Sequence, residues 1–174
     1  VVRDERDLPP RHGTYAVVTC LDCGARLSRW ALHEQLERLN PDFGARVASR
    51  GAIEVAPDAV YIAGTFNTVA GQSRPRVASF TPSGAIRSFR ANVQSRIVND
   101  IATSPDGSRV FIGGAFEKVN EVPRLGTAAL AGSNGALLPW DISDQVYSWG
   151  PDAAVGSVTT DDTNVYFTSF AFLS

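Results

Sequence analysis

The residues whose types and spacing most clearly suggest a chemical role are Cys20 and Cys23, in the stretch Cys-Leu-Asp-Cys-Gly. Two thiolates on one tight turn can share a tetrahedral zinc ion, and this spacing is typical of one half of such a site. The same spacing can form a redox pair, but no strand–helix–strand pattern surrounds it here. The sequence favours a third interpretation, in which the two cysteines lie in a turn and have neither role. Cys20 and Cys23 are therefore the candidate metal ligands, and the redox and inert alternatives stay open.

The only other soft metal ligands in the chain are His12 and His33. Together with the cysteine pair they would supply the four ligands that structural zinc needs. Seven residues separate His12 from Cys20 and nine separate Cys23 from His33, and these spacings fit no standard zinc pattern. We therefore assign no cofactor and expect no tightly bound metal.

Other polar and aromatic residues suggest weaker sites. Four aspartates invite a calcium interpretation, but their spacing fits no EF-hand loop, and acidic turns between strands are common. Two tryptophans could stack on a sugar, although packing between sheets is the favoured role. No Ser/His/Asp set and no glycine-rich phosphate loop is visible, so the sequence favours a non-enzyme and leaves an enzyme open. The aspartates are Asp141, Asp144, Asp161 and Asp162, and the tryptophans are Trp140 and Trp149.

Composition places these residues in a globular protein. The chain has 174 residues, 44% hydrophobic and 20% charged, with a formal net charge of -2. This balance is typical of a folded domain rather than a disordered one. The absence of a basic surplus argues against a nucleic-acid partner. No apolar run approaches the roughly 20 residues of a membrane-spanning helix.

An internal repeat determines how the elements are organised. The stretch VYIAGTF, which begins at Val60, recurs as VFIGGAF from Val110. A third copy begins within VGSVTTDDTNVYFTSFAF, near the end of the chain. An ordered series of such matches indicates duplication of one structural unit. The structural repeat residues that we match are Gly64 with Gly114, Phe66 with Phe116, and Arg76 with Arg124. The recurring arginines are expected to donate hydrogen bonds to loop carbonyls.

The sequence of each unit predicts four short strands. In the second copy we expect them at residues 97–103, 109–114, 126–131 and 136–140, with an Asp-Gly hairpin turn after the first. A four-stranded unit of about 50 residues is typical of a propeller blade. The predicted fold class is all-β: a partial β-propeller of roughly 50-residue four-stranded blades, with a small N-terminal helical or α/β segment. A β-sandwich and a solenoid are the alternatives.

The first part of the chain does not follow the repeat well. Leu32, Leu36 and Leu39 form an apolar helical stripe, for which Ser28 would be the N-terminal cap. A strand is expected within residues 14–20. We therefore predict two parts: an N-terminal segment with the Cys-x-x-Cys motif and one helix at 1–45, and an incomplete propeller of about two and a half blades at 46–174. The N-terminal segment is alternatively a diverged first blade.

The stretch VFIGGAFEKVNEVPRLGTAALAGSNGALLPW resembles the delta-sixty repeat propellers, over about residues 50–174. The units of that family read roughly Val-Tyr-Ile-Gly-Gly-x-Phe, Val-Asn-Gly, an Arg, and a Gly turn. Ala63, Ala70 and Glu121 depart from this pattern, and the third copy lacks the Gly-x-Phe. The resemblance implies a secreted or cell-surface bacterial propeller and no shared catalytic residue.

These observations together lead us to expect a non-enzymatic extracellular module for binding or scaffolding. The alternatives are a propeller-based glycan hydrolase or lyase, and a zinc or redox accessory role of Cys20 and Cys23. We expect a protein or glycan ligand, no nucleic acid and no membrane span. About two and a half blades cannot close a ring of four to eight. We therefore expect self-association, or that the chain is a portion of a longer propeller.

Overall fold

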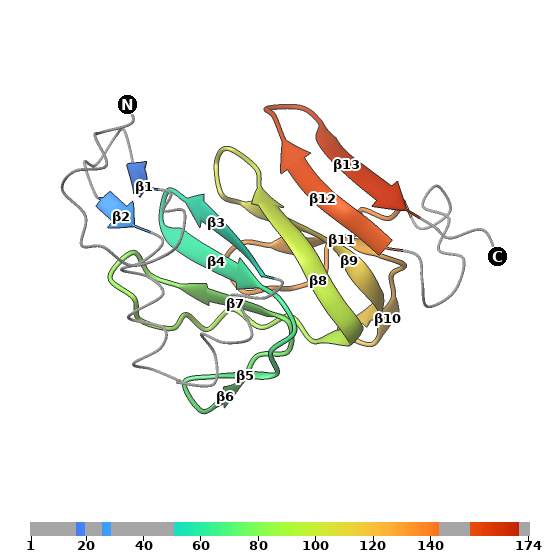
Figure 1. Cartoon of the computed structure of the whole chain (residues 1–174), viewed down its shortest axis with the longest axis horizontal. Coiled ribbons are helices and arrows are strands. Elements are labelled where there is room, and N and C mark those ends of the chain that lie inside the picture. Colours follow the sequence, from blue (N-terminus) through green and yellow to red (C-terminus); the bar gives the residue numbers. More distant parts are fainter. Residues whose placement is uncertain (1–16, 20–25, 29–50, 143–153, 171–174) are drawn as a thin grey trace, which may run out of the picture.

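The computed structural model describes residues 17–19, 26–28, 51–142 and 154–170 (Figure 1). Every regular element in these ranges is a β-strand, so the all-β prediction is confirmed. Strand β1 (Val17–Thr19) pairs antiparallel with β2 (Arg26–Ser28), and β1 falls within the strand expected at 14–20. Ser28, the expected N-terminal cap, is the last residue of β2. The predicted helix, the boundary at residue 45 and both cysteines lie outside the described residues.

Unit 1, residues 52–91, is a three-stranded antiparallel sheet in the order β3-β4-β7. Strand β4 is buried at every position and is wholly apolar, as expected for a strand covered on both faces. A small hairpin, β5-β6, lies in the connection between β4 and β7. The bounds are β3 (Ala52–Ala56), β4 (Ala59–Ala63), β5 (Thr68–Val69), β6 (Gln72–Ser73) and β7 (Val77–Phe80).

Unit 2, residues 93–142, repeats this arrangement with longer strands. Its sheet has the order β8-β9-β11, and β10 pairs with the far end of β9. Residues 104–108 close the β8–β9 hairpin, where the Asp-Gly turn was predicted; Gly107 there has a φ of 69°. The bounds are β8 (Val93–Thr103), β9 (Arg109–Val119), β10 (Val122–Pro123) and β11 (Thr127–Ala131).

The predicted fourth strand of each unit is wrong. It is reduced to a single bridge, Phe80 with Ile86 in unit 1 and Leu130 with Leu137 in unit 2. Beyond this bridge the chain leaves the sheet, and one aromatic side chain of each unit packs in the core. Phe89 packs edge-on against Tyr61, and Trp140 packs in the same way against Phe111, each at 5.4 Å between ring centroids.

The described part of unit 3 is an antiparallel hairpin of β12 (Ala154–Thr160) and β13 (Val165–Phe170). This hairpin covers the outer side of unit 2, as Figure 1 shows. Its packing depends on Gly113 of β9. A Cβ atom at this position would lie 2.5 Å from Val158 Cγ2 and 2.6 Å from Val155 Cγ1.

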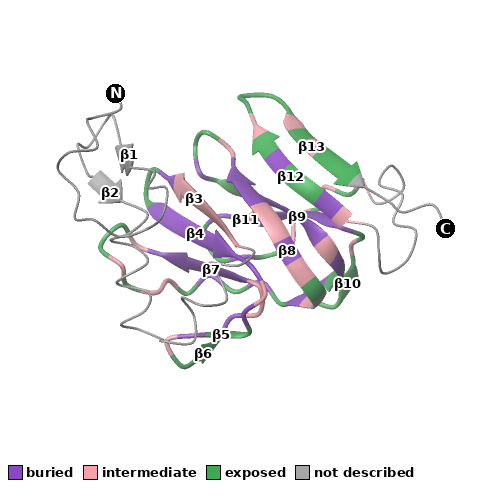
Figure 2. Cartoon of the chain, in the orientation of Figure 1, coloured by how far each residue is buried: buried purple, intermediate pink, exposed green. Residues whose placement is uncertain are grey.

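The core lies between the units. One apolar cluster joins unit 1 to unit 2, and another joins unit 2 to the β12-β13 hairpin. A third lies on the other face of unit 1 and contains Phe66 and Phe80. Figure 2 shows the buried residues concentrated on β4, β7 and β9. The sheets are therefore stacked face to face. The described strands close no barrel, and the partial propeller remains a prediction.

Candidate functional site

The two arginine loops are the most closely repeated polar features of the described residues. We define them as residues 66–77 of unit 1 and 116–127 of unit 2. Each begins with the repeated phenylalanine, and Phe66 and Phe116 are both only 2% exposed, as the repeat predicted. The amides of Gly64 and Gly114 each donate a 2.9 Å hydrogen bond across the loop. The two rings therefore anchor equivalent loops on equivalent sheets.

A two-residue hairpin turn projects each loop from its sheet. In unit 1 the turn residues Ala70 and Gly71 have φ values of 49° and 72°. In unit 2 the residues Asn120 and Glu121 have φ values of 50° and 66°. Positive φ at both central positions is the mark of the type I′ turn, which suits the twist of a tight hairpin.

The match of Arg76 with Arg124 is wrong. The Arg74 amide donates to the Asn67 carbonyl at 2.8 Å, and the Arg124 amide donates to the Glu117 carbonyl at 2.8 Å. Arg74 is therefore the counterpart of Arg124. The constant offset of 50 residues gives the same pairing, so the sequence contained this signal.

Arg76 is instead the counterpart of Gly126. Their amides donate to the carbonyls of Phe66 and Phe116, at 2.8 and 3.0 Å. Arg76 has a φ of 67°, in the region where glycine is favoured. Its guanidinium donates to main-chain carbonyls, including that of Arg96 at 2.9 Å, and burial lowers its pKa. The prediction that Arg76 is a donor to loop carbonyls is confirmed.

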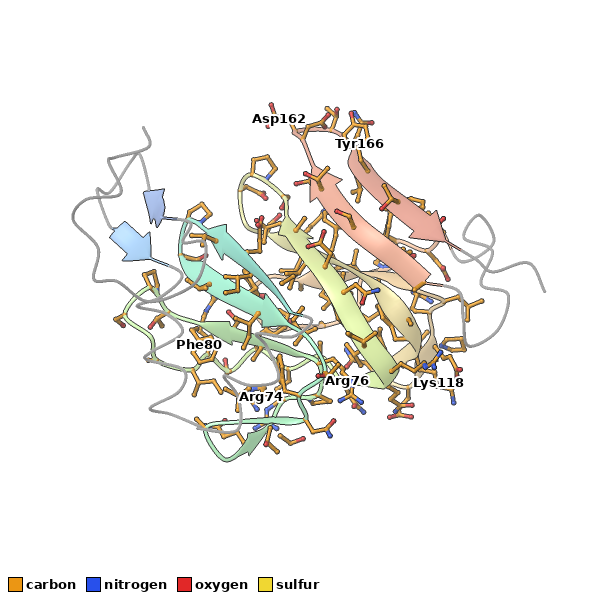
Figure 3. All side chains as sticks on the ribbon, in the orientation of Figure 1. Arg74, Arg76, Phe80, Lys118, Asp162 and Tyr166 are labelled. Atoms are coloured by element: carbon orange, nitrogen blue, oxygen red, sulfur yellow. The ribbon has the colours of Figure 1, made fainter. Side chains whose placement is uncertain are left out.

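Arg74 lies beside the β5-β6 hairpin and is only 2% exposed (Figure 3). Its Nη1 donates to the Ser73 carbonyl at 2.8 Å, and its Nη2 donates to Gln72 Oε1 at 2.9 Å and to the Arg87 carbonyl at 3.3 Å. Its Nε has no hydrogen-bond partner. Burial, and then the nearby charge of Arg90, lower the pKa of Arg74. Among the described residues, the hydrogen-bond acceptors of this cation are all neutral oxygens.

Arg124 has a carboxylate partner. Its Nη1 donates to the Pro123 carbonyl at 2.8 Å and lies 2.9 Å from Asp141 Oδ2. Asp141, a calcium candidate in the sequence, is therefore one half of an ion pair. Unit 2 thus neutralises the arginine that unit 1 leaves without a carboxylate.

The other predicted site residues do not gather into one place. The Asp161 carboxylate accepts the amides of Thr163 and Asn164 and the Tyr166 hydroxyl, and these hydrogen bonds lower its pKa. Asp161 is therefore a turn residue of the β12–β13 hairpin. Within the described ranges, no group of three or more His, Cys, Asp or Glu side chains could hold a metal ion. Cys20, Cys23, Asp144 and Trp149 lie outside these ranges.

Trp140 is a packing residue, as the sequence favoured. It lies against the cluster that joins unit 2 to unit 3, with its ring edge-on to Phe111. The described residues include no helix long and apolar enough to cross a membrane.

Comparison with known proteins gives one informative similarity. The chain is 52% identical over 54 residues to NAD-dependent protein deacetylase 1 of Mycobacterium avium (strain 104). The match covers 31% of this chain and 19% of that enzyme, so the chain spans about a fifth of its relative. No family model matches the chain. No solved structure matches it either.

This similarity corrects two expectations from the sequence. The relative is an enzyme, which contradicts a non-enzymatic binding or scaffolding module. An NAD-dependent protein deacetylase, similar over 31% of the chain, also contradicts the expected secreted or cell-surface location. The protein or glycan ligand and the alternative of a glycan-acting enzyme stay predictions. The sequence-based argument rested on the repeat, which indicates a fold and identifies no chemistry. The delta-sixty resemblance stays untested.

Proposed function

We propose that this chain takes part in NAD-dependent removal of acetyl groups from protein, through the residues that it shares with the Mycobacterium avium enzyme. The observation that carries this proposal is the 52% identity over 54 residues. Because the chain corresponds to only 19% of the relative, the proposed role is a contribution to the activity and not the whole catalytic apparatus. An acetylated protein is then the proposed protein partner.

The shared residues are proposed to lie before the repeat, in the first fifty or so. The 50-residue units resemble one another, so a relative similar to one unit would be expected to match the next as well. The observed match is 54 residues long, close to the length of the chain that precedes the repeat. On this proposal, the repeated β-units are a separate part of the chain joined to an enzyme-derived segment.

The described β-units do not fit NAD. Dinucleotide sites use a glycine-rich turn that opens a helix, whose N-terminal amides hold the pyrophosphate. The described ranges contain no helix, and their left-handed glycines, such as Gly71 and Gly107, lie in turns between strands or in loops. They also contain no histidine or cysteine. We therefore assign the described residues no part in the reaction.

A segment exchange tests the proposal directly. The 54 matched residues of the Mycobacterium avium enzyme are replaced by those of this chain, and deacetylation of an acetylated peptide is followed with and without NAD. Retained NAD-dependent activity supports the proposal. A folded hybrid enzyme without activity contradicts it. The matched control is a hybrid that receives residues 60–113 of the repeat, of equal length, and we expect it to be inactive.

The cysteines can be tested in the same proteins. Cys20 and Cys23 remain the candidate metal ligands, and a tetrahedral zinc site would need two further ligands. Elemental analysis of the purified chain, and of a variant with Cys20→Ser and Cys23→Ser, measures the bound zinc. Stoichiometric zinc that is lost in the double variant assigns the cysteines as ligands. Equal and negligible zinc in both proteins assigns them as turn residues without a metal.

A further inference from the structure

The two arginine loops share their main-chain hydrogen bonds but differ in charge. The aromatic pairs establish which residues correspond: Phe89 packs on Tyr61 as Trp140 packs on Phe111. The residue that follows each outer aromatic is therefore equivalent. In unit 2 that residue is Asp141, and in unit 1 it is Arg90.

The two guanidinium groups differ in one contact. In unit 2, Nη1 of Arg124 donates to the preceding carbonyl at 2.8 Å and also meets Asp141 Oδ2 at 2.9 Å. In unit 1, Nη1 of Arg74 donates to the preceding carbonyl at the same distance of 2.8 Å. This nitrogen carries two hydrogens. The second one, which in unit 2 points to a carboxylate, has no such partner in unit 1.

Neighbouring charges do not compensate Arg74. The nearby Arg87 is paired with Asp58 at 3.2 Å, so that carboxylate is already engaged. Arg90, the residue that corresponds to Asp141, is exposed, and its positive charge is close enough to lower the pKa of Arg74. A buried guanidinium without a counter-charge is unfavourable unless an anion is supplied from elsewhere. The region around Arg74 and Arg90 is thus electrostatically incomplete.

We propose that unit 1 binds an external carboxylate group between Nη1 of Arg74 and the side chain of Arg90. A carboxylate fits because the equivalent arginine of unit 2 already holds one, and a guanidinium recognises carboxylates through directed, charge-assisted hydrogen bonds. Two sources share this chemistry: an acidic side chain of a protein, and a small free carboxylate. The proposal is independent of deacetylation.

The test uses two reciprocal substitutions in the full chain. Arg90→Asp gives unit 1 the ion pair of unit 2, and Asp141→Arg gives unit 2 the charges of unit 1. Thermal unfolding is followed in sodium acetate and in sodium chloride of equal ionic strength. A capped tripeptide with a central aspartate is the second ligand. Arg90→Ala is added because it removes the repulsion without introducing a carboxylate.

We expect acetate to raise the Tm of the unaltered chain beyond the effect of chloride, since a ligand of the folded state stabilises it. Arg90→Asp should raise the Tm without acetate and abolish the acetate-specific increase, and Arg90→Ala should weaken that increase. Asp141→Arg should enlarge it. A midpoint concentration for the peptide about tenfold below that for acetate identifies a protein side chain as the source; equal midpoints identify a free carboxylate.

Either of two results overturns the proposal: an unaltered chain that responds equally to acetate and chloride, or an Arg90→Asp variant that keeps the full acetate response. Neither result depends on NAD or on acetylated peptide. Failure of this inference and failure of the proposed function are therefore distinguishable.

Discussion

Gly113 is the position where a single methyl group should disturb the stacking of unit 3 on unit 2. An added Cβ would lie 2.5 Å from Val158 Cγ2 and 2.6 Å from Val155 Cγ1. Carbon atoms in contact prefer about 3.5 Å or more, so the hairpin would have to move by about 1 Å. Both valines are buried, at 7% and 0% exposed, and β-branched side chains have little rotamer freedom. We therefore expect Gly113→Ala to destabilise the chain.

The size of the effect follows from two opposing terms. Overpacking of a tight core costs about 1–3 kcal/mol. Replacing glycine by alanine restricts the unfolded chain and returns about 0.4–1 kcal/mol. The net loss for Gly113→Ala is therefore about 1–2 kcal/mol. For a domain of this size, each kcal/mol lowers the Tm by about 2–4 °C.

Urea denaturation followed by circular dichroism measures this loss. Ala63 is the unit 1 residue at the same place in the repeat, so Ala63→Gly is the matched control. We expect it to cost about 1–2 kcal/mol, because it adds the flexibility of glycine and removes a methyl group that is fully buried. Adding Val158→Ala to Gly113→Ala should recover part of the loss, giving a coupling energy of at least about 0.5 kcal/mol. A Gly113→Ala chain as stable as the unaltered one would refute the close packing of unit 3.

Three further outcomes are expected. Phe66→Ala and Phe116→Ala should each cost about 3–5 kcal/mol in urea denaturation, and a loss below about 1 kcal/mol for either would contradict its place in a packed core. Tyr61→Phe removes the 2.8 Å hydrogen bond from Tyr61 to the Gly132 carbonyl, at a cost of about 1 kcal/mol. Burial raises the pKa of Tyr61 above its ordinary 10.0, so its stabilising contribution is complete below pH 10.0 and is lost as the pH rises through the higher folded value. The Tyr61→Phe variant should lack that alkaline loss in unfolding measured against pH. Hydrogen bonds from the Ser104 hydroxyl and the Ser108 amide lower the pKa of Asp106 from 3.8 to about 2, so its contribution is present above pH 3.8 and is lost as the pH falls through about 2. A carboxyl-carbon NMR titration that gave Asp106 an ordinary pKa would contradict this.

The repeat made much of the β-sheet predictable from sequence. A constant offset of 50 residues fixed the burial of Phe66 and Phe116, because two copies of one unit bury the same side chain. The strands expected at 97–103 and 109–114 lie within β8 and β9, but β8 begins earlier, at Val93, and β9 continues to Val119. The fourth strands were predicted too long, because strand propensity does not reveal that Phe89 and Trp140 leave the sheet for the core between units.

The charge difference between the loops was harder to predict. Arg74 corresponds to Arg124 at the constant offset of 50 residues. Arg76 lies two residues further along and, like Arg124, follows a proline, so matching the Pro-Arg pairs aligned the wrong arginine. The correspondence of Arg90 with Asp141 needs an offset of 51, because one residue is inserted in the intervening turn. The equivalence of Arg90 and Asp141 is shown by the edge-on ring pairs of the residues that precede them, Phe89 and Trp140.

The left-handed positions of the two arginine loops have a consequence for protein engineering. Unit 1 places Gly71 where unit 2 has Glu121, and unit 2 places Gly126 where unit 1 has Arg76; all four have positive φ. Unit 2 also has Asn120, which tolerates this conformation better than Ala70 does. Each natural unit is thus relaxed where the other is strained. A consensus unit that combines Asn-Gly in the turn with glycine at the later position would contain only residues suited to left-handed backbone. Tandem copies of that unit would form a repeat array whose length could be chosen by the designer.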